Sequence, residues 1–187
     1  MSADVIILTG PPGAGKSTTA RHLAESFSRS VHLHTDDFWD YIVTGGILPY
    51  LPESDQQNQT VMRVIQQAAF TYAAGGFNTV VDGIIGPWMI GRFAADSRVA
   101  AAPRLHYVVL RPSRDEAVRR AQARTRPGAL VDEGPIVSLW EQFADLGGLE
   151  PHAIDTTDQT PPETLQAVAD AIGSGRFVLD PAAAQST

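Results

Sequence analysis

The hydrophobic residues of this chain fall into two kinds of pattern that alternate along it. The first is a short, mainly apolar run bounded by Gly, Pro or Asp, which is typical of a strand buried on both faces of a parallel sheet. Runs of this kind lie at residues 5–9, 31–35, 79–81, 105–110 and 152–155. We therefore expect five strands that lie mainly parallel in one sheet.

The second pattern places apolar residues three or four positions apart, the spacing of a helix with one buried face. Residues 16–27 show it first, and a helix that begins near Phe38 follows the second run. Further segments lie at residues 61–74, 113–124, 136–146 and 162–172. Because strands alternate with helices, the sequence predicts a three-layer α/β/α fold with right-handed crossovers.

Length and composition fit a single domain over residues 1–178, with a flexible tail at 179–187. The chain has no cysteine, which excludes disulfides and thiolate metal sites. The first apolar run is too short for a secretory signal and no stretch approaches a membrane span, so we expect a cytoplasmic protein. The net charge of −7 makes nucleic acid an unlikely partner. The sequence does not indicate an oligomeric state.

The turn after the first run reads GPPGAGKS, which matches the phosphate-binding pattern G-x-x-x-x-G-K-[ST]. Glycines let backbone N–H groups turn inward around a phosphate, and the next helix directs its N-terminal amides at the anion. Lys16 would reach the β- and γ-phosphates, and the Ser17 hydroxyl would bind Mg²⁺. The expected nucleotide-binding residues of this loop are Gly10, Pro11, Pro12, Gly13, Ala14, Gly15, Lys16, Ser17 and Thr18. The alternative is a Gly/Pro-rich turn that opens a helix by chance.

The only lysine of the chain lies in this loop, whereas thirteen residues are arginine. A guanine-specific N-K-x-D signature needs a second lysine, so a GTPase is disfavoured. The length also leaves no room for the larger ATPase cores. The expected ligands are therefore ATP and Mg²⁺.

Four further segments follow GPPGAGKST in order, namely HTDDFW, VVDGII, LRPSRDEAVRRAQAR and IDTT. Together they resemble the small P-loop kinases and phosphotransferases, a group that holds gluconate and shikimate kinases, chloramphenicol phosphotransferase and nucleoside monophosphate kinases. This resemblance covers nearly the whole chain. It implies strand order 2-3-1-4-5, an acceptor-binding insert at about 37–75 and a lid at about 111–130. It also implies transfer of the γ-phosphoryl group of ATP to a hydroxyl of a small molecule.

Carboxylates at the ends of the second and third runs are candidates for catalysis and metal binding. Asp36 stands where related phosphotransferases have the Asp that orients the acceptor hydroxyl and takes its proton. Asp37 could share this role or bind Mg²⁺ through water, and capping of the helix near Phe38 is the alternative for both. Asp82 would hold Mg²⁺ directly or through water, unless it is only a turn residue before Gly83.

Arginines gather in the helix after the fourth run. Arg120 and Arg124 share one helix face, where as catalytic residues they would neutralise charge on the transferred phosphoryl group. Arg120 would also bind the nucleotide. A solvated face paired with nearby carboxylates is the alternative, and it suits Arg119 best. Arg126 stands where a lid loop would turn. By the same resemblance Thr156 would lie beside the adenine, or else it belongs to an ordinary turn.

Aromatic and sulfur-containing side chains are frequent in the expected acceptor region, namely Phe38, Trp39, Tyr41, Tyr50, Trp88 and Met89. They favour a moderately apolar alcohol over a sugar phosphate, although they are equally compatible with a core. The histidines at 32, 34, 106 and 152 show no metal-binding spacing, and no chemistry is assigned to them. A regulatory NTPase without a small-molecule acceptor and a nucleic-acid end kinase remain alternative functions.

Overall fold

The computed structural model describes residues 3–49, 51–96, 103–125 and 129–180. Five parallel strands form one sheet in the order β2-β3-β1-β4-β5, which confirms the predicted fold class and strand order. The strands are β1 (Val5–Thr9), β2 (Ser30–His34), β3 (Asn78–Asp82), β4 (Leu105–Leu110) and β5 (Ala153–Ile154). The carboxyl ends of β1, β2 and β3 thus lie at one edge, where open α/β sheets bind ligands.

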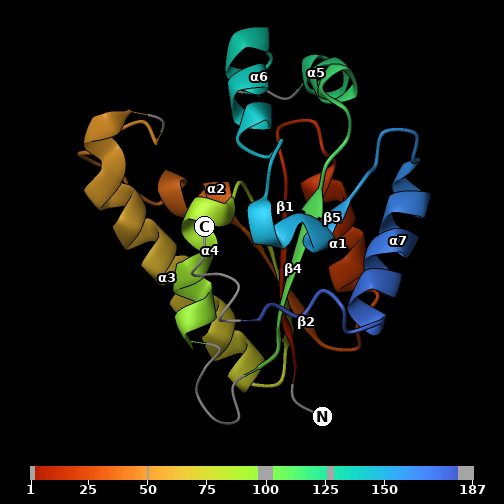
Figure 1. Cartoon of the computed structure of the whole chain (residues 1–187). Coiled ribbons are helices and arrows are strands. Elements are labelled where there is room, and N and C mark those ends of the chain that lie inside the picture. Colours follow the sequence, from red (N-terminus) through yellow and green to blue (C-terminus); the bar gives the residue numbers. More distant parts are fainter. Residues whose placement is uncertain (1–2, 50, 97–102, 126–128, 181–187) are drawn as a thin grey trace.

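Helices cover both faces of the sheet (Figure 1). Helices α1 and α7 lie on one face and α3 and α4 on the other, whereas α5 and α6 stand at the carboxyl edge of the strands. Their bounds are α1 (Lys16–Glu25), α2 (Thr35–Asp40), α3 (Asp55–Ala74), α4 (Pro87–Asp96), α5 (Arg114–Gln122), α6 (Glu133–Glu141) and α7 (Pro161–Gly173), with 3₁₀ turns at Pro52–Ser54 and Gly147–His152.

Strand β1 shows why a continuous apolar run is needed at the centre of the sheet. All five of its residues are buried. Val5 and Ile7 pack on the side of α3 and α4, while Ile6 and Leu8 pack on the side of α1 and α7. Full burial of one such side chain stabilises the fold by about 1.5–3 kcal/mol. The central strand therefore joins both layers of helices to the sheet.

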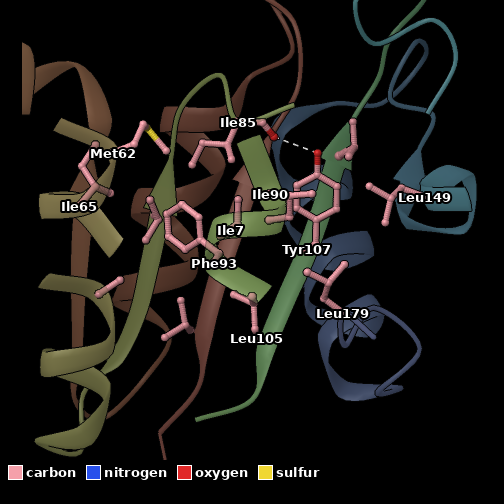
Figure 2. Packing of buried hydrophobic residues seen from close by; sticks show 14 of the residues in the cluster. Ile7, Met62, Ile65, Ile85, Ile90, Phe93, Leu105, Tyr107, Leu149 and Leu179 are labelled. Atoms are coloured by element: carbon pink, nitrogen blue, oxygen red, sulfur yellow. Dashed lines mark hydrogen bonds between the residues drawn. The ribbon is translucent and has the colours of Figure 1, made fainter. Parts of the chain in front are cut away.

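The core on the α3/α4 side also holds a polar contact (Figure 2). Ile90 and Phe93 of α4 pack with Ile7 and Tyr107 in one cluster. The buried Tyr107 hydroxyl donates a hydrogen bond of 2.9 Å to the Ile85 carbonyl. This bond ties the segment after β3 to β4, which lies on the other side of β1 in the sheet.

Several elements differ from the sequence prediction. Helix α4 was not predicted, because Pro87, Trp88 and Gly91 obscure its apolar spacing. Helix α3 begins at Asp55, six residues before the predicted 61–74, since its first turns are polar and half-exposed. Helix α6 ends at Glu141, well before the predicted 146. Strand β5 is only two residues long, and His152 lies in the preceding 3₁₀ turn.

The segment after α7 returns to the sheet. Leu179 is buried, and its N–H donates a hydrogen bond of 2.8 Å to the Leu105 carbonyl. Residues 181–187 of the expected tail lie outside the described residues. Among the described residues, no helix combines the length and the apolar character needed to span a membrane.

Candidate phosphate-binding and catalytic site

The loop between β1 and α1 has the backbone that a phosphate cradle requires. Gly10 and Gly13 have φ angles of +141° and +83°, a region that favours glycine. A Cβ at Gly10 would lie 2.1 Å from the Leu110 carbonyl oxygen, and one at Gly13 would lie 2.1 Å from that of Ala117. The loop is thus packed directly against the end of β4 and against α5.

Lys16 is buried at the start of α1, beside this loop. Its Nζ donates a hydrogen bond of 2.9 Å to the Pro11 carbonyl. Burial lowers the pKa of Lys16 to about 8, and Arg124 acts in the same direction, while Asp82 and Asp36 oppose both. A buried ammonium has two further donors to offer, and an anion beside it would favour its charged form. The residues present therefore fit a bound phosphate.

Asp82 lies at the carboxyl end of β3 and is fully buried. The Ser17 hydroxyl donates a 2.6 Å hydrogen bond to its Oδ2. His32 Nε2 lies 2.5 Å from its Oδ1, and His34 Nδ1 lies 3.1 Å from Oδ1 and 3.2 Å from Oδ2. Burial raises the pKa of Asp82, but these three partners outweigh it and hold the pKa well below its usual range. Asp82 is thus an ionised carboxylate directed at the phosphate loop.

The two histidines are the residues that sequence reasoning missed. They occupy alternate positions of β2, so both side chains lie on the same face of that strand, toward Asp82. The hydrogen bond with Asp82 raises the pKa of His34, although burial lowers it. The available signal was their i, i+2 spacing on a strand, together with the pairing of that strand with the one that ends at Asp82.

The predicted base Asp36 is in the first turn of α2. Its Oδ2 lies 3.6 Å from His34 Nε2, and its side chain is 79% exposed. The N-cap of α2 is His34, and no side chain caps this helix, so neither Asp36 nor Asp37 has the capping role considered above. Asp37 is exposed as well. Asp36 is therefore free to meet a ligand beside the phosphate loop.

The arginines of α5 differ in their surroundings. Arg120 binds Glu116 through Nε at 2.5 Å, and its Nη2 donates to the carbonyls of Thr156 and Thr157 at 3.0 and 2.9 Å. Arg119 pairs with the same Glu116 at 2.6 Å and is exposed, as the solvated alternative predicted. Arg120 thus holds the loop after β5 in place.

Arg124 lies two residues beyond the end of α5, because the helix ends at Gln122, so it does not share a helix face with Arg120 as predicted. Partial burial lowers its pKa and Asp36 raises it, and Arg124 in turn lowers the pKa of Lys16. Arg126 lies outside the described residues.

Thr156 is fully buried, so its side chain is not open to a ligand. Its Oγ1 has no hydrogen-bond partner among the described residues, and neither has the buried Oε1 of Gln159. The Thr156 carbonyl accepts from Arg120 instead. Any contact of Thr156 with a nucleobase would therefore involve its backbone.

The described aromatic residues of the expected acceptor region have different surroundings. Phe38 and Tyr41 line a groove of about 590 Å³ between α2 and α3, with apolar and amide side chains. Trp39 extends elsewhere, and its indole N–H donates to Asn58 at 2.9 Å. Trp88 is half-exposed and packs edge-on against Phe143. Met89 packs against the core, and Tyr50 lies outside the described residues.

A metal ion at this site would need ligands beyond the protein. Within the part of the chain that the structure describes, no three side chains of His, Asp or Glu are placed to hold a metal by themselves. Ser17 and Asp82 offer two adjacent oxygens instead. Mg²⁺ is commonly held by one or two protein oxygens together with substrate phosphates and water, and this pair fits that requirement.

Comparison with known proteins identifies a family that includes the residues of this site. A family model described as an AAA domain matches residues 5–142, a stretch that includes the phosphate loop, Asp36, Asp82 and α5. No curated protein matches the chain.

Solved structures with the same fold include several small kinases. A gluconokinase from Sinorhizobium meliloti 1021 is 18% identical with a TM-score of 0.70, and the match covers 94% of each chain. The shikimate kinase from Acinetobacter baumannii is 20% identical with a TM-score of 0.62, over 93% of this chain and 95% of that one. At such identities the likeness shows the fold.

A third similar structure belongs to a Pnkp1/Rnl/Hen1 RNA repair complex. It is 18% identical with a TM-score of 0.59, and the match covers 75% of this chain but only 43% of that longer chain. Because a protein of RNA repair shares the fold, the expectation that nucleic acid is not a partner remains a prediction.

Proposed function

This chain belongs to the AAA domain family, and from that premise we propose that it is an ATP- and Mg²⁺-dependent phosphotransferase with a hydroxyl acceptor. The observation that supports the proposal is the convergence of three charged groups at the carboxyl edge of the sheet. Lys16 lies in the phosphate loop, Asp82 is ionised beside Ser17, and Asp36 is exposed 3.6 Å from His34. These are the groups that phosphoryl transfer to an alcohol requires.

The phosphate loop would bind the donor. Backbone N–H groups of residues 10–17 and the N-terminus of α1 would hold the β-phosphate, and Lys16 would reach the β- and γ-phosphates. Ser17 and Asp82 would hold Mg²⁺, which neutralises charge on the phosphates. Arg124 would neutralise charge on the transferred group.

Asp36 would orient the acceptor. Its carboxylate accepts a hydrogen bond from the hydroxyl and takes the proton late in the reaction. The new bond joins the hydroxyl oxygen to the γ-phosphorus, and the bond from that phosphorus to the bridging oxygen of ADP breaks. The products are ADP and a phosphate ester. Arg120 would act indirectly, since it holds the loop at 156–159 that lies after β5.

The acceptor itself is proposed only as a class. We assign its binding to the region 37–75 and closure of the site to the region 111–130. The fold is shared with a gluconokinase and a shikimate kinase, so a small metabolite alcohol is the first candidate. An RNA or DNA 5′-hydroxyl is the second candidate, because an RNA repair complex contains the same fold.

A screen of hydroxyl compounds with ATP and Mg²⁺ tests the proposal. It should include gluconate, shikimate, other sugars and polyols, hydroxyl-bearing antibiotics, and oligonucleotides with a free 5′-hydroxyl. At least one compound should raise ADP formation above the rate with water alone. Lys16→Ala should abolish this increase. Hydrolysis that no compound stimulates would instead identify a regulatory NTPase.

A further inference from the structure

The buried carboxylate of Asp82 has its two oxygens in different environments. Oδ1 is approached by His32 Nε2 at 2.5 Å and by His34 Nδ1 at 3.1 Å. Oδ2 accepts the Ser17 hydroxyl at 2.6 Å and also lies 3.2 Å from His34 Nδ1. His32 therefore binds Oδ1, His34 bridges the two oxygens, and Oδ2 is the oxygen that meets the serine hydroxyl.

The pairing of two strands brings these groups together. His34 and Asp82 are partners in the register of β2 and β3, and His32 lies two residues earlier on the same face of β2. A Cβ on Gly83 would lie 1.9 Å from Thr35 Oγ1, so the two strands remain in close contact just beyond these residues. The donors and their acceptor thus come from adjacent, paired strands.

Both imidazoles are largely shielded from solvent, with side-chain exposures of 22% for His32 and 23% for His34. Rotation of a carboxylate that accepts these two ring N–H groups would leave both partly buried donors unpaired. Loss of a partner from a buried polar group is costly, so the rotation is opposed. The orientation of Oδ2 toward Ser17 is therefore set by the histidines.

We propose that His32 and His34 are positioning residues that orient Asp82 so that its Oδ2, together with Ser17 Oγ, holds Mg²⁺. This inference rests on the proposed function, because it requires Mg²⁺ with a nucleotide at the phosphate loop. Residues that hydrogen-bond a metal-binding carboxylate commonly change metal affinity 10–100-fold when they are replaced. His34 also faces Asp36 through its other ring nitrogen, at 3.6 Å. One strand thereby adjoins both carboxylates of the site.

Two amide substitutions test the proposal in a crossed design. Glutamine can place its terminal N–H₂ near the position of a histidine Nε2, and asparagine can place its own near that of Nδ1. His32 uses Nε2 and His34 uses Nδ1 toward Asp82. His32→Gln and His34→Asn should therefore retain the bond to Asp82. His32→Asn and His34→Gln should lose it, with a similar polarity and little change of volume.

The measurement is the dissociation constant of Mg²⁺ from the full-length protein saturated with the ATP analogue AMP-PNP, by isothermal titration calorimetry. His32→Asn and His34→Gln should weaken Mg²⁺ binding about 10–100-fold, while the other two variants stay within about threefold of the wild type. Equal Mg²⁺ affinity of all four variants, or the reverse pattern, would overturn the proposal. Thermal unfolding of each variant shows whether it is folded. If a variant at one histidine does not fold, the Mg²⁺ affinities of the two variants at the other histidine decide the outcome.

The outcome is separate from that of the proposed function. If no hydroxyl compound stimulates ADP formation by the wild type but the crossed pattern of Mg²⁺ affinity is seen, the function fails and the positioning role holds. If the wild type transfers phosphate and the four variants bind Mg²⁺ equally, the positioning role fails alone. A purely structural role would change the unfolding temperature without changing the Mg²⁺ affinity of the folded protein.

Discussion

Replacing Gly13 by alanine should destabilise the protein more than replacing Gly15 by alanine, although both glycines belong to the same loop. Their backbone angles are nearly equal, with φ of +83° and +86°. Their surroundings differ, because a Cβ at Gly13 would lie 2.1 Å from the Ala117 carbonyl oxygen, whereas a Cβ at Gly15 has nothing within 4 Å. Comparison of the two variants therefore separates the free-energy cost of the contact with Ala117 from the cost of the positive φ angle.

The expected difference follows from these two terms. A positive φ costs a non-glycine residue about 1–2 kcal/mol, and this term applies to both variants. Only Gly13→Ala must in addition separate the loop from α5, and overpacking of this kind costs about 1–3 kcal/mol. In a protein of this size 1 kcal/mol lowers the unfolding temperature by about 2–4 °C, so a 2 kcal/mol contact corresponds to about 4–8 °C.

Thermal unfolding by circular dichroism, without nucleotide, measures this difference. Gly13→Ala should unfold several degrees below Gly15→Ala, which in turn should unfold below the wild type. Equal unfolding temperatures for the two variants would refute the claim that the phosphate loop packs directly on α5. A crystal structure of Gly13→Ala should show α5 displaced from the loop.

Two further predictions concern stability away from the loop. Arg120→Ala should lower the free energy of unfolding, measured in urea, by about 2 kcal/mol, because it removes charged hydrogen bonds to three carbonyls. Arg119 is exposed, so Arg119→Ala should change this free energy little. Equal losses in the two variants would contradict the prediction. Burial lowers the pKa of His152 below 6.5, so the unfolded chain binds more protons and stability is lost as the pH falls below that value. The free energy of unfolding of the wild type should therefore exceed that of His152→Asn by less at pH 5.5 than at pH 7.5. A difference that does not change with pH would refute the lowered pKa of His152.

Much of the fold followed from local pattern, because the strands of a doubly covered parallel sheet must be apolar throughout. The runs at 5–9 and 105–110 coincide with β1 and β4. Helix α4 was missed because its core residues Ile90 and Phe93 stand on either side of Gly91, shortly after Pro87 and Trp88, a composition that weakens a helical pattern. Its stability comes from packing against the sheet, which no local pattern shows.

Some residues of the candidate site could be proposed from the sequence and others could not. Residues contributed by one local motif, such as Lys16 and Ser17, could be assigned because the loop geometry fixes their direction. His32 and His34 could not, because their role depends on the pairing of β2 with β3 and on the burial of Asp82, which is a tertiary effect. Arg120 was expected at the phosphates, but its carbonyl partners after β5 are distant in sequence.

Acceptor-stimulated ADP formation by Asp36→Asn, measured beside ATP affinity, tests the central claim most directly. The substitution keeps the size of the side chain and removes the carboxylate that would orient and deprotonate the hydroxyl. With an acceptor from the screen, the wild type should form ADP faster than with water. Asp36→Asn should keep its ATP dissociation constant and lose about 10²–10⁴-fold in the stimulated rate. An unchanged stimulated rate in Asp36→Asn, or no stimulation of the wild type by any hydroxyl compound or oligonucleotide, would contradict the account.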